Sequence, residues 1–199
     1  MNMSAFQAVV IGASAGGTTA LQKILAMLPG NFPLPVIVAQ HVHPHQESAA
    51  RIYKDIGLLK IKDGDEKEAI QPGFVYFAPP NYHLLIENDH TLSLSIDPKV
   101  HYARPSVDVL FESAADAYRA ALIGIILGGA NQDGAMGLLR VGQYGGLTIV
   151  QYPGEAEVCF MPRAAIETAN PQYVLPVKKI ISLLIEITTQ HLDEAAHAR

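Results

Sequence analysis

The stretch Ala8-Val9-Val10-Ile11-Gly12-Ala13-Ser14-Ala15-Gly16-Gly17 decides the fold of this 199-residue chain. It begins with a short apolar run typical of a buried strand, and the small residues that follow permit a sharp turn into a helix. The next segment, 18–27, places apolar side chains on one stripe of a helix: Leu21, Ile24, Leu25 and, just beyond it, Leu28. In the turn, the pattern G-x-S-x-G predicts that Ser14 presents a reactive hydroxyl.

Two other glycine-rich motifs fail at single positions of this turn. A dinucleotide-binding fingerprint requires a glycine where Ser14 stands, and a phosphate-binding P-loop requires a lysine after Gly17, which the chain lacks. The remaining alternative is a tight turn in which Ser14 caps the following helix. A reactive serine needs an imidazole to take its proton and usually a carboxylate to orient that imidazole. The partners of Ser14 therefore decide between the two interpretations.

Composition limits the class of protein. A chain of this length with 49% hydrophobic residues can bury one substantial core, so we expect a single domain over residues 1–199. We expect a soluble, cytoplasmic protein, because no apolar run is long enough to cross a bilayer and no secretory signal opens the chain. A net charge of −5 without clustered lysine or arginine argues against nucleic-acid binding. Cys159 is the only cysteine and lies among apolar neighbours, which favours packing over nucleophilic chemistry.

Strand and helix patterns alternate along most of the chain. The expected strands after the first helix are 36–39, 122–127 and 147–150. The expected helices are one that begins at the cap Ser106, one around 138–141, and two over 162–168 and 177–192. Segments 83–87 and 91–96 flank Asn88-Asp89 like a β-hairpin, and 74–77 is expected at an edge or in the same small lobe. The order predicts an α/β fold with a doubly wound, mostly parallel sheet flanked by helices and a small β-hairpin lobe.

Three polar residues follow predicted core strands. Ser14, His41 and Asp133 stand where the first strand, the second strand and the 122–127 strand end. In doubly wound sheets, ligands bind outside the carboxyl ends of the strands, at the point where the strand order reverses. The three side chains can therefore meet, as nucleophile, base and orienting carboxylate.

Structural roles remain open for two of these residues. His41 could be a hydrogen-bonded structural histidine, and Asp133 could cap the helix that follows it. The series His41, His43, His45 could suggest a metal site, but Pro44 interrupts any single helix face and no carboxylate completes a zinc motif. We expect neither a metal nor another cofactor.

Several further stretches give the chain a family resemblance. They are Ile11-Gly12-Ala13-Ser14 with Gly16-Gly17, Gln40-His41, Ala78-Pro79 with His83-Leu84-Leu85, Arg104-Pro105-Ser106-Val107-Asp108-Val109-Leu110-Phe111, Gln132-Asp133-Gly134-Ala135 with Gly137, and Met161-Pro162-Arg163-Ala164-Ala165-Ile166. Over nearly its whole length the chain resembles the catalytic domain of CheB-type chemotaxis protein-glutamate methylesterases.

The resemblance implies an activity and its residues. It implies a cytoplasmic serine hydrolase that removes γ-methyl esters from glutamates of methyl-accepting chemotaxis receptors, releases methanol and can deamidate certain receptor glutamines. Ser14, His41 and Asp133 match the family's catalytic triad, and the amides of Ala15 and Gly16 would hold the oxyanion. Ala130 and Met161 match positions beside the substrate, although Met161 could instead fill the core before the helix that follows it.

The chain also departs from the family pattern. The family commonly has threonine at the position of Ala15 and a Thr-Gly-Met-Gly run where this chain has Gly128-Gly129-Ala130-Asn131. We also expect no receiver domain, because the nucleophile turn comes almost at the start of the sequence. A catalytically weak or inactive homologue that binds a receptor or signalling partner, and a small-molecule esterase, are therefore alternatives. The oligomeric state is open.

The Arg104-to-Phe111 string carries an expectation of its own. Val107, Leu110 and Phe111 have the spacing of a packed helix face, and Arg104 and Asp108 are four residues apart. We expect these two to form an internal ion pair, in preference to a substrate role for Arg104.

Overall fold

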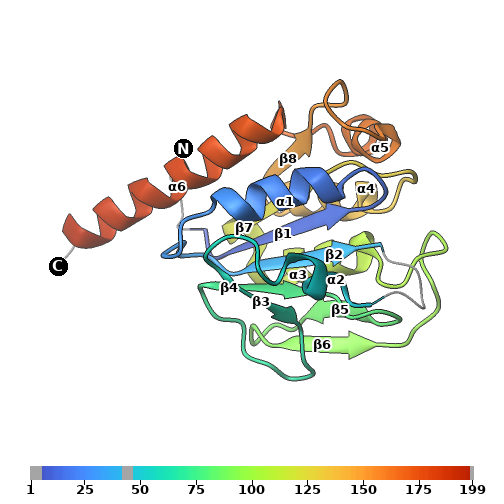
Figure 1. Cartoon of the computed structure of the whole chain (residues 1–199), viewed down its shortest axis with the longest axis horizontal. Helices are drawn as coiled ribbons and strands as arrows, with labels where there is room; N and C mark the ends of the chain where they lie inside the picture. The colour runs from blue at the N-terminus through green and yellow to red at the C-terminus, as the bar shows by residue number, and fades with distance from the viewer. Residues whose placement is uncertain (1–5, 42–46, 198–199) are drawn as a thin grey trace.

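The computed structural model describes residues 6–41 and 47–197 (Figure 1). Its main sheet has seven strands in the order β3-β4-β2-β1-β7-β8-β9, and every neighbouring pair is parallel. The strands are β1 (Ala8–Ala13), β2 (Val36–Gln40), β3 (Lys60–Asp63), β4 (Phe74–Phe77), β7 (Leu122–Ile126), β8 (Leu147–Gln151) and β9 (Tyr173–Leu175). Strands β5 (His83–Ile86) and β6 (Leu92–Ser95) form a separate antiparallel pair. The predicted fold class is confirmed.

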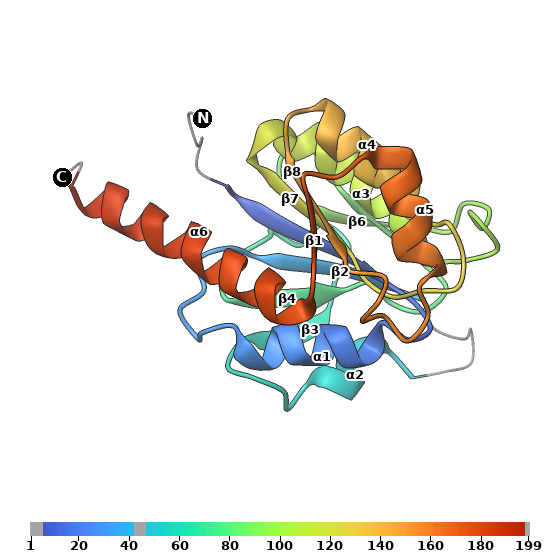
Figure 2. The same cartoon turned by 90° about the horizontal axis from the view of Figure 1, so that it is seen from above.

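Helices cover both faces of the sheet, as Figure 2 shows from above. One layer contains α1 (Thr18–Met27), α2 (Ala49–Tyr53) and α6 (Val177–His197), and the other contains α3 (Val107–Tyr118), α4 (Ala135–Gln143) and α5 (Phe160–Ala169). Successive strand residues alternate between two buried cores. Val9 and Ile11 pack with α1 and α6, whereas Ala8 and Val10 pack with α3 and α4. None of the described helices is long and apolar enough to span a bilayer.

The strand order reverses at β1. From β1 the chain first builds the β2 side of the sheet, and it later returns to β7 on the opposite side of β1 before continuing to β8 and β9. Gly12 of β1 pairs in register with both Ala39 of β2 and Ile126 of β7, so these three strands end together. Their carboxyl ends consequently bring the segments after Ala13, Gln40 and Ile126 to one place.

One predicted position in the sheet is wrong. The segment Phe74–Phe77 was expected at an edge or in the hairpin lobe, but β4 lies inside the main sheet between β2 and β3. The edge is instead formed by β3, whose sequence Lys-Ile-Lys-Asp contains a single apolar residue. Charged residues are common on edge strands because they discourage pairing with another chain, and they also hide the strand pattern. Strand β9 and the short helix α2 were not predicted either.

Candidate functional site

Ser14 ends β1 in a turn held by backbone hydrogen bonds. Its amide donates to the carbonyl of Gly128 at 3.0 Å, and the amide of Gly17 donates to the Ser14 carbonyl at 2.9 Å. Gly16 has a φ of +78°, a conformation that glycine adopts without steric cost. The N-cap of α1 is Gly17, and no side chain caps the helix there. The hydroxyl of Ser14 is thus not used as a helix cap.

The turn packs against the loop after β7 without room for side chains. A Cβ atom on Gly17 would lie 2.5 Å from the carbonyl oxygen of Gly128, and one on Gly128 would lie 2.9 Å from that of Gly16. Both contacts are to backbone, which cannot move aside as the end of a side chain can. These glycines let the β1 turn and the β7 loop approach closely enough for Ser14 to bond to Gly128.

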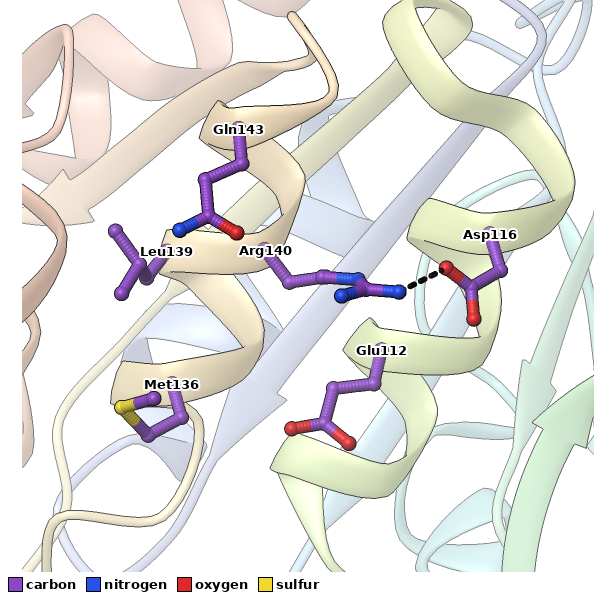
Figure 3. A pocket seen from close by; sticks show the side chains of 6 residues that line it. All are labelled: Glu112, Asp116, Met136, Leu139, Arg140 and Gln143. Carbon is purple, nitrogen blue, oxygen red and sulfur yellow. Dashed lines mark hydrogen bonds and ion pairs between the residues drawn. The ribbon is translucent and has the colours of Figure 1, made fainter.

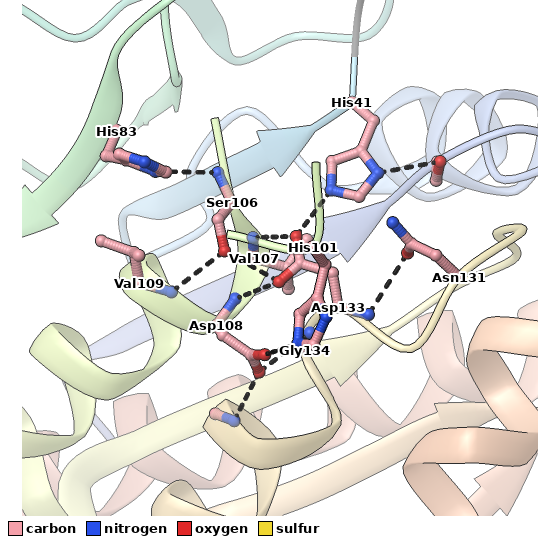
Figure 4. Close-up of polar contacts among 12 residues, drawn as sticks. His41, His83, His101, Ser106, Val107, Asp108, Val109, Asn131, Asp133 and Gly134 are labelled. Carbon is pink, nitrogen blue, oxygen red and sulfur yellow. Dashed lines mark hydrogen bonds and ion pairs between the residues drawn. The ribbon is translucent and has the colours of Figure 1, made fainter. Parts of the chain in front are cut away.

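His41 links the Ser14 turn to the β7 loop. It follows the last residue of β2, and its amide donates to the Ala13 carbonyl at 3.0 Å. Its ring Nδ1 lies 3.0 Å from Oγ of Ser14, and its Nε2 lies 2.7 Å from Oδ2 of Asp133 (Figure 4). The structure therefore brings the three predicted side chains into one hydrogen-bonded chain. Their catalytic roles remain predictions.

Asp133 is fully buried at the N-terminus of α3. Its Oδ1 accepts from the Ser106 hydroxyl at 2.8 Å and from the Asp108 amide at 3.0 Å, while Oδ2 accepts from the Val107 amide at 2.8 Å. Burial raises the pKa of Asp133, but the hydrogen bonds from His41 and from the Asp108 and Val107 amides outweigh it, so the pKa lies below its usual value. An ionised carboxylate only accepts hydrogen bonds. The proton between the two residues therefore belongs to Nε2 of His41, which leaves Nδ1 free to accept from Ser14.

A second buried carboxylate supports the first. Oδ1 of Asp108 accepts from the amides of Gly134 and Gly137 at 2.9 and 2.7 Å, and thereby caps the start of α4 directly after Asp133. Burial is the main cause that raises the pKa of Asp108 to about 6, and the negative charge of Asp133 adds to it. Helices α3 and α4 are thus joined through two aspartates, each bound to backbone amides of the other segment.

The expected ion pair between Arg104 and Asp108 is wrong. Asp108 faces the α4 amides and, through Oδ2, Nε2 of His101 at 3.4 Å. Arg104 uses its Nη1 to donate to the carbonyls of Ile96 and Asp97, at 2.6 and 3.0 Å. Arg104 precedes the helix cap Ser106, so the four-residue spacing that pairs side chains on a helix does not apply to it.

The remaining predicted residues lie in the Ser14 turn, in the loop after β7 and at the start of α5. Ala15 is exposed and Gly16 half-buried, and their amides donate to no other described residue, which leaves both donors available beside Ser14. Ala130 is exposed. Met161 is buried, and its amide donates to the Gly129 carbonyl at 2.9 Å. This hydrogen bond connects Met161 to the loop after β7, and a contact of Ala130 or Met161 with substrate stays a prediction.

The ring of His41 faces a cavity of about 270 Å³. The cavity is further lined by Asn131 and by the loop before α3, including Lys99, His101, Tyr102 and Arg104. A separate hollow of about 290 Å³ lies between α3 and α4, where Arg140 forms an ion pair with Asp116 at 2.9 Å (Figure 3). None of the three candidate catalytic residues lines this second hollow, whereas His41 lines the first.

No group of three metal-binding side chains occurs among residues 6–41 and 47–197. Of the histidine series considered above, His43 and His45 lie outside the described residues. His83 serves a structural purpose, because its Nδ1 accepts from the Ser106 amide at 3.2 Å and its Nε2 lies 3.2 Å from the Pro98 carbonyl oxygen.

Sequence reasoning missed the residues that hold Asp133 in place. Ser106 was predicted only as the cap of α3, and its oxygen does accept from the Val109 amide, at 3.5 Å. Its hydrogen bond to Asp133 spans 27 residues. The only signal for it was the string Arg104-Pro105-Ser106-Val107-Asp108 itself. Asn131, whose side chain accepts from the Asp133 amide at 3.2 Å, was noted only as a departure from the family pattern.

Known proteins resemble this chain in sequence and structure. The family described as CheB methylesterase matches residues 9–184. A Thermotoga maritima protein named protein-glutamate methylesterase/protein-glutamine glutaminase is 37% identical over 183 residues, which cover 90% of this chain and 53% of that protein. A Leptospira interrogans relative, whose name contains the same two activities, is 47% identical over 95% of this chain and 98% of its own length. The crystal structure of the T. maritima CheB methylesterase catalytic domain matches with a TM-score of 0.87 at 36% identity, over 92% of this chain and 99% of that domain.

Proposed function

Because the chain belongs to the CheB methylesterase family of ester hydrolases, we propose that it removes γ-methyl esters from glutamates on the cytoplasmic helices of chemotaxis receptors and releases methanol. It also deamidates certain receptor glutamines, in keeping with relatives named for both activities. The observation that carries the proposal is the position of the His41 ring, within hydrogen-bond distance of both Ser14 and Asp133.

The first half of the reaction forms an acyl-enzyme. Oγ of Ser14 attacks the ester carbonyl while its proton passes to Nδ1 of His41. The resulting imidazolium is stabilised by Asp133 through the 2.7 Å contact at Nε2. Collapse of the tetrahedral intermediate breaks the bond to the methoxy oxygen, and Nδ1 returns the proton to the departing methanol.

The negative charge of the tetrahedral intermediate falls beside the Ser14 turn. The amides of Ala15 and Gly16, which donate to no other described residue, stabilise that charge. Backbone donors do not depend on side-chain identity, so the replacement of threonine by Ala15 leaves this contribution in place.

The second half of the reaction regenerates the serine. Water replaces methanol beside His41, gives a proton to Nδ1 and attacks the glutamyl ester of Ser14. Collapse then releases the glutamate side chain, and the proton returns from Nδ1 to Oγ of Ser14. With a glutamine substrate the same steps release ammonia in place of methanol.

The proposal extends to the setting of the enzyme. The chain acts as one methylesterase domain in the cytoplasm, where the receptor helices lie, and it needs no cofactor because serine, imidazole and carboxylate supply the chemistry.

Methanol release from methylated receptor tests the function. We compare the parent chain with Ser14→Ala and with Ser182→Ala, a control that removes an exposed hydroxyl from α6. The parent and the control should release methanol at equal rates, while Ser14→Ala should be slower by a thousandfold or more. Equal release by the parent and Ser14→Ala would overturn the proposal. Hydrolysis of an aryl ester without activity on receptor would indicate a small-molecule esterase.

A further inference from the structure

The cavity beside His41 carries positive charge on one wall. Lys99 and Arg104 line it together with His41, His101 and Asn131, and its described lining contains no acidic residue. The chain as a whole has a net charge of −5. The charge of this wall is therefore opposite to the net charge of the protein, and it lies beside the candidate base His41.

Arg104 keeps its charge without a carboxylate partner among the described residues. Its Nη1 donates only to the carbonyls of Ile96 and Asp97, and its Nε is buried without a hydrogen-bond partner. A guanidinium pairs well with a carboxylate, and leaving one uncompensated in a partly buried site is unfavourable. An anion in the cavity would supply the negative charge that the guanidinium of Arg104 lacks as a partner.

The loop that carries these cations is held in a fixed shape. Val100 and Ala103 exchange backbone hydrogen bonds of 3.1 and 2.8 Å, and the two residues between them, His101 and Tyr102, have φ values of 48° and 63°. Left-handed backbone at two successive non-glycine residues is strained, and such strain is typical of functional sites. His101 is tied to Asp108, whereas Tyr102 is 97% exposed. The turn thus exposes the aromatic ring of Tyr102 at the cavity that Lys99 also lines.

We propose that Arg104 and Lys99 bind a carboxylate of the substrate protein, on an acidic residue that flanks the target glutamyl ester. The cations select and position the substrate, and they take no part in bond making. This inference rests on the proposed function, because it assigns a specificity contact to the same site. The 270 Å³ cavity has room for the ester side chain together with a neighbouring group.

Peptide binding tests the inference apart from catalysis. In a Ser14→Ala background, fluorescence anisotropy compares two dye-labelled peptides that carry the same glutamyl methyl ester, flanked by glutamates in one and by glutamines in the other. The acidic peptide should bind about five- to tenfold more tightly at low salt, as expected for one or two partly exposed charge pairs. The preference should shrink as salt screens it.

Two further substitutions and a control test whether Lys99 and Arg104 cause the preference for the acidic peptide. Lys99→Gln should reduce it severalfold, and Lys99 makes no described hydrogen bond whose loss would disturb the fold. Lys54→Gln, at the exposed end of α2, is the matched control and should leave it unchanged. Arg104→Lys should retain part of the preference, since it keeps the charge but not the fork.

Three results would overturn the inference: equal affinity for the two peptides, a preference unaffected by Lys99→Gln, or no measurable binding of either peptide at millimolar concentration. A charge preference found in a chain that releases no methanol would refute the proposed reaction while supporting the carboxylate site.

Discussion

The carboxylate of Asp133 contacts Nε2 of His41, not Nδ1, at 2.7 Å. The ring consequently offers Nδ1 to Ser14, the reverse of the arrangement in the chymotrypsin-type triad, where Nε2 faces the serine. Either nitrogen can accept the serine proton, provided that the carboxylate binds the other one and fixes the tautomer. The ionised carboxylate of Asp133 therefore determines that Nδ1 of His41 is the nitrogen that accepts the serine proton.

Replacing Asp133 with asparagine should lower kcat by a thousandfold or more, a loss on the scale known for triads of this kind. Three donors from Ser106, Val107 and Asp108 converge on the two oxygens, so an amide NH₂ placed there opposes a donor in either orientation. The neutral amide also cannot stabilise the imidazolium of His41. Steady-state kinetics on a methylated receptor peptide measure the effect. A decrease of less than tenfold would mean that Asp133 does not orient the base.

Ser106→Ala should lower kcat about tenfold with little change in KM. The substitution removes the 2.8 Å hydrogen bond to Oδ1 of Asp133, which loosens the carboxylate without removing it. Hydrogen bonds to charged groups contribute about 1.5 to 3 kcal/mol, and only part of this acts on the reaction. Ser113→Ala is the control, because this hydroxyl of the same helix donates to the Val109 and Leu110 carbonyls and accepts from the Ile86 amide, without a contact to Asp133. Similar kcat values for both variants would make Ser106 a helix cap only.

Ala15 and Gly128 stand where the family commonly has threonine, and introducing threonine at the two positions should affect the stability of the protein differently. Ala15 is exposed, so Ala15→Thr should change the free energy of unfolding by less than about 0.5 kcal/mol. At Gly128, a Cβ atom would lie 2.9 Å from the Gly16 carbonyl oxygen, so Gly128→Thr must push the Ser14 turn away from the β7 loop. We expect it to cost about 1 to 3 kcal/mol and to reduce activity as well. Urea unfolding of the two variants measures both effects, and equal stabilities would show that the turn has room to adapt.

How well the sequence predicts the fold and the candidate site depends on how far apart along the chain the interacting residues lie. The β1 strand and the turn at Ser14 follow from local patterns, and the doubly wound topology then places His41 and Asp133 beside them. The bond from Ser106 to Asp133 is not accessible in this way, because the cap of α3 already explains that serine locally. Arg104 was paired with Asp108 by a helical spacing that fails outside the helix.

The predicted sheet was incomplete for a similar reason. Strand β3 has only Ile61 as an apolar residue, so neither alternation nor a continuous apolar run marks it. Without β3, Phe74–Phe77 had no neighbour beyond it and was expected at an edge or in the hairpin lobe. Pairing of β3 with β4 depends on tertiary contacts that intrinsic strand preference does not encode.

Asp108 should make the stability of the protein fall as the pH rises through about 6. Its pKa in the folded chain is raised from the usual 3.8 to about 6, so between these values the folded state binds a proton that the unfolded state has lost. The stabilisation from this group is complete below pH 3.8 and disappears above about pH 6. Two pH units correspond to at most about 3 kcal/mol. The lowered pKa of Asp133 acts in the opposite sense, because its contribution is lost only as the pH falls.

Asp108→Asn isolates the contribution of Asp108, because an amide does not titrate and its oxygen can still accept from Gly134 and Gly137. The free energy of unfolding of the parent minus that of Asp108→Asn should decrease by about 2 to 3 kcal/mol between pH 4 and pH 7. Urea unfolding at several pH values measures this difference. Asp116→Asn, at the exposed ion pair with Arg140, should show only a small change over the same range. If the difference in the free energy of unfolding between the parent and Asp108→Asn stayed constant with pH, Asp108 would be ionised over the whole range. The hydrogen bonds from the α4 amides would then stabilise its charge enough to offset the effect of burial.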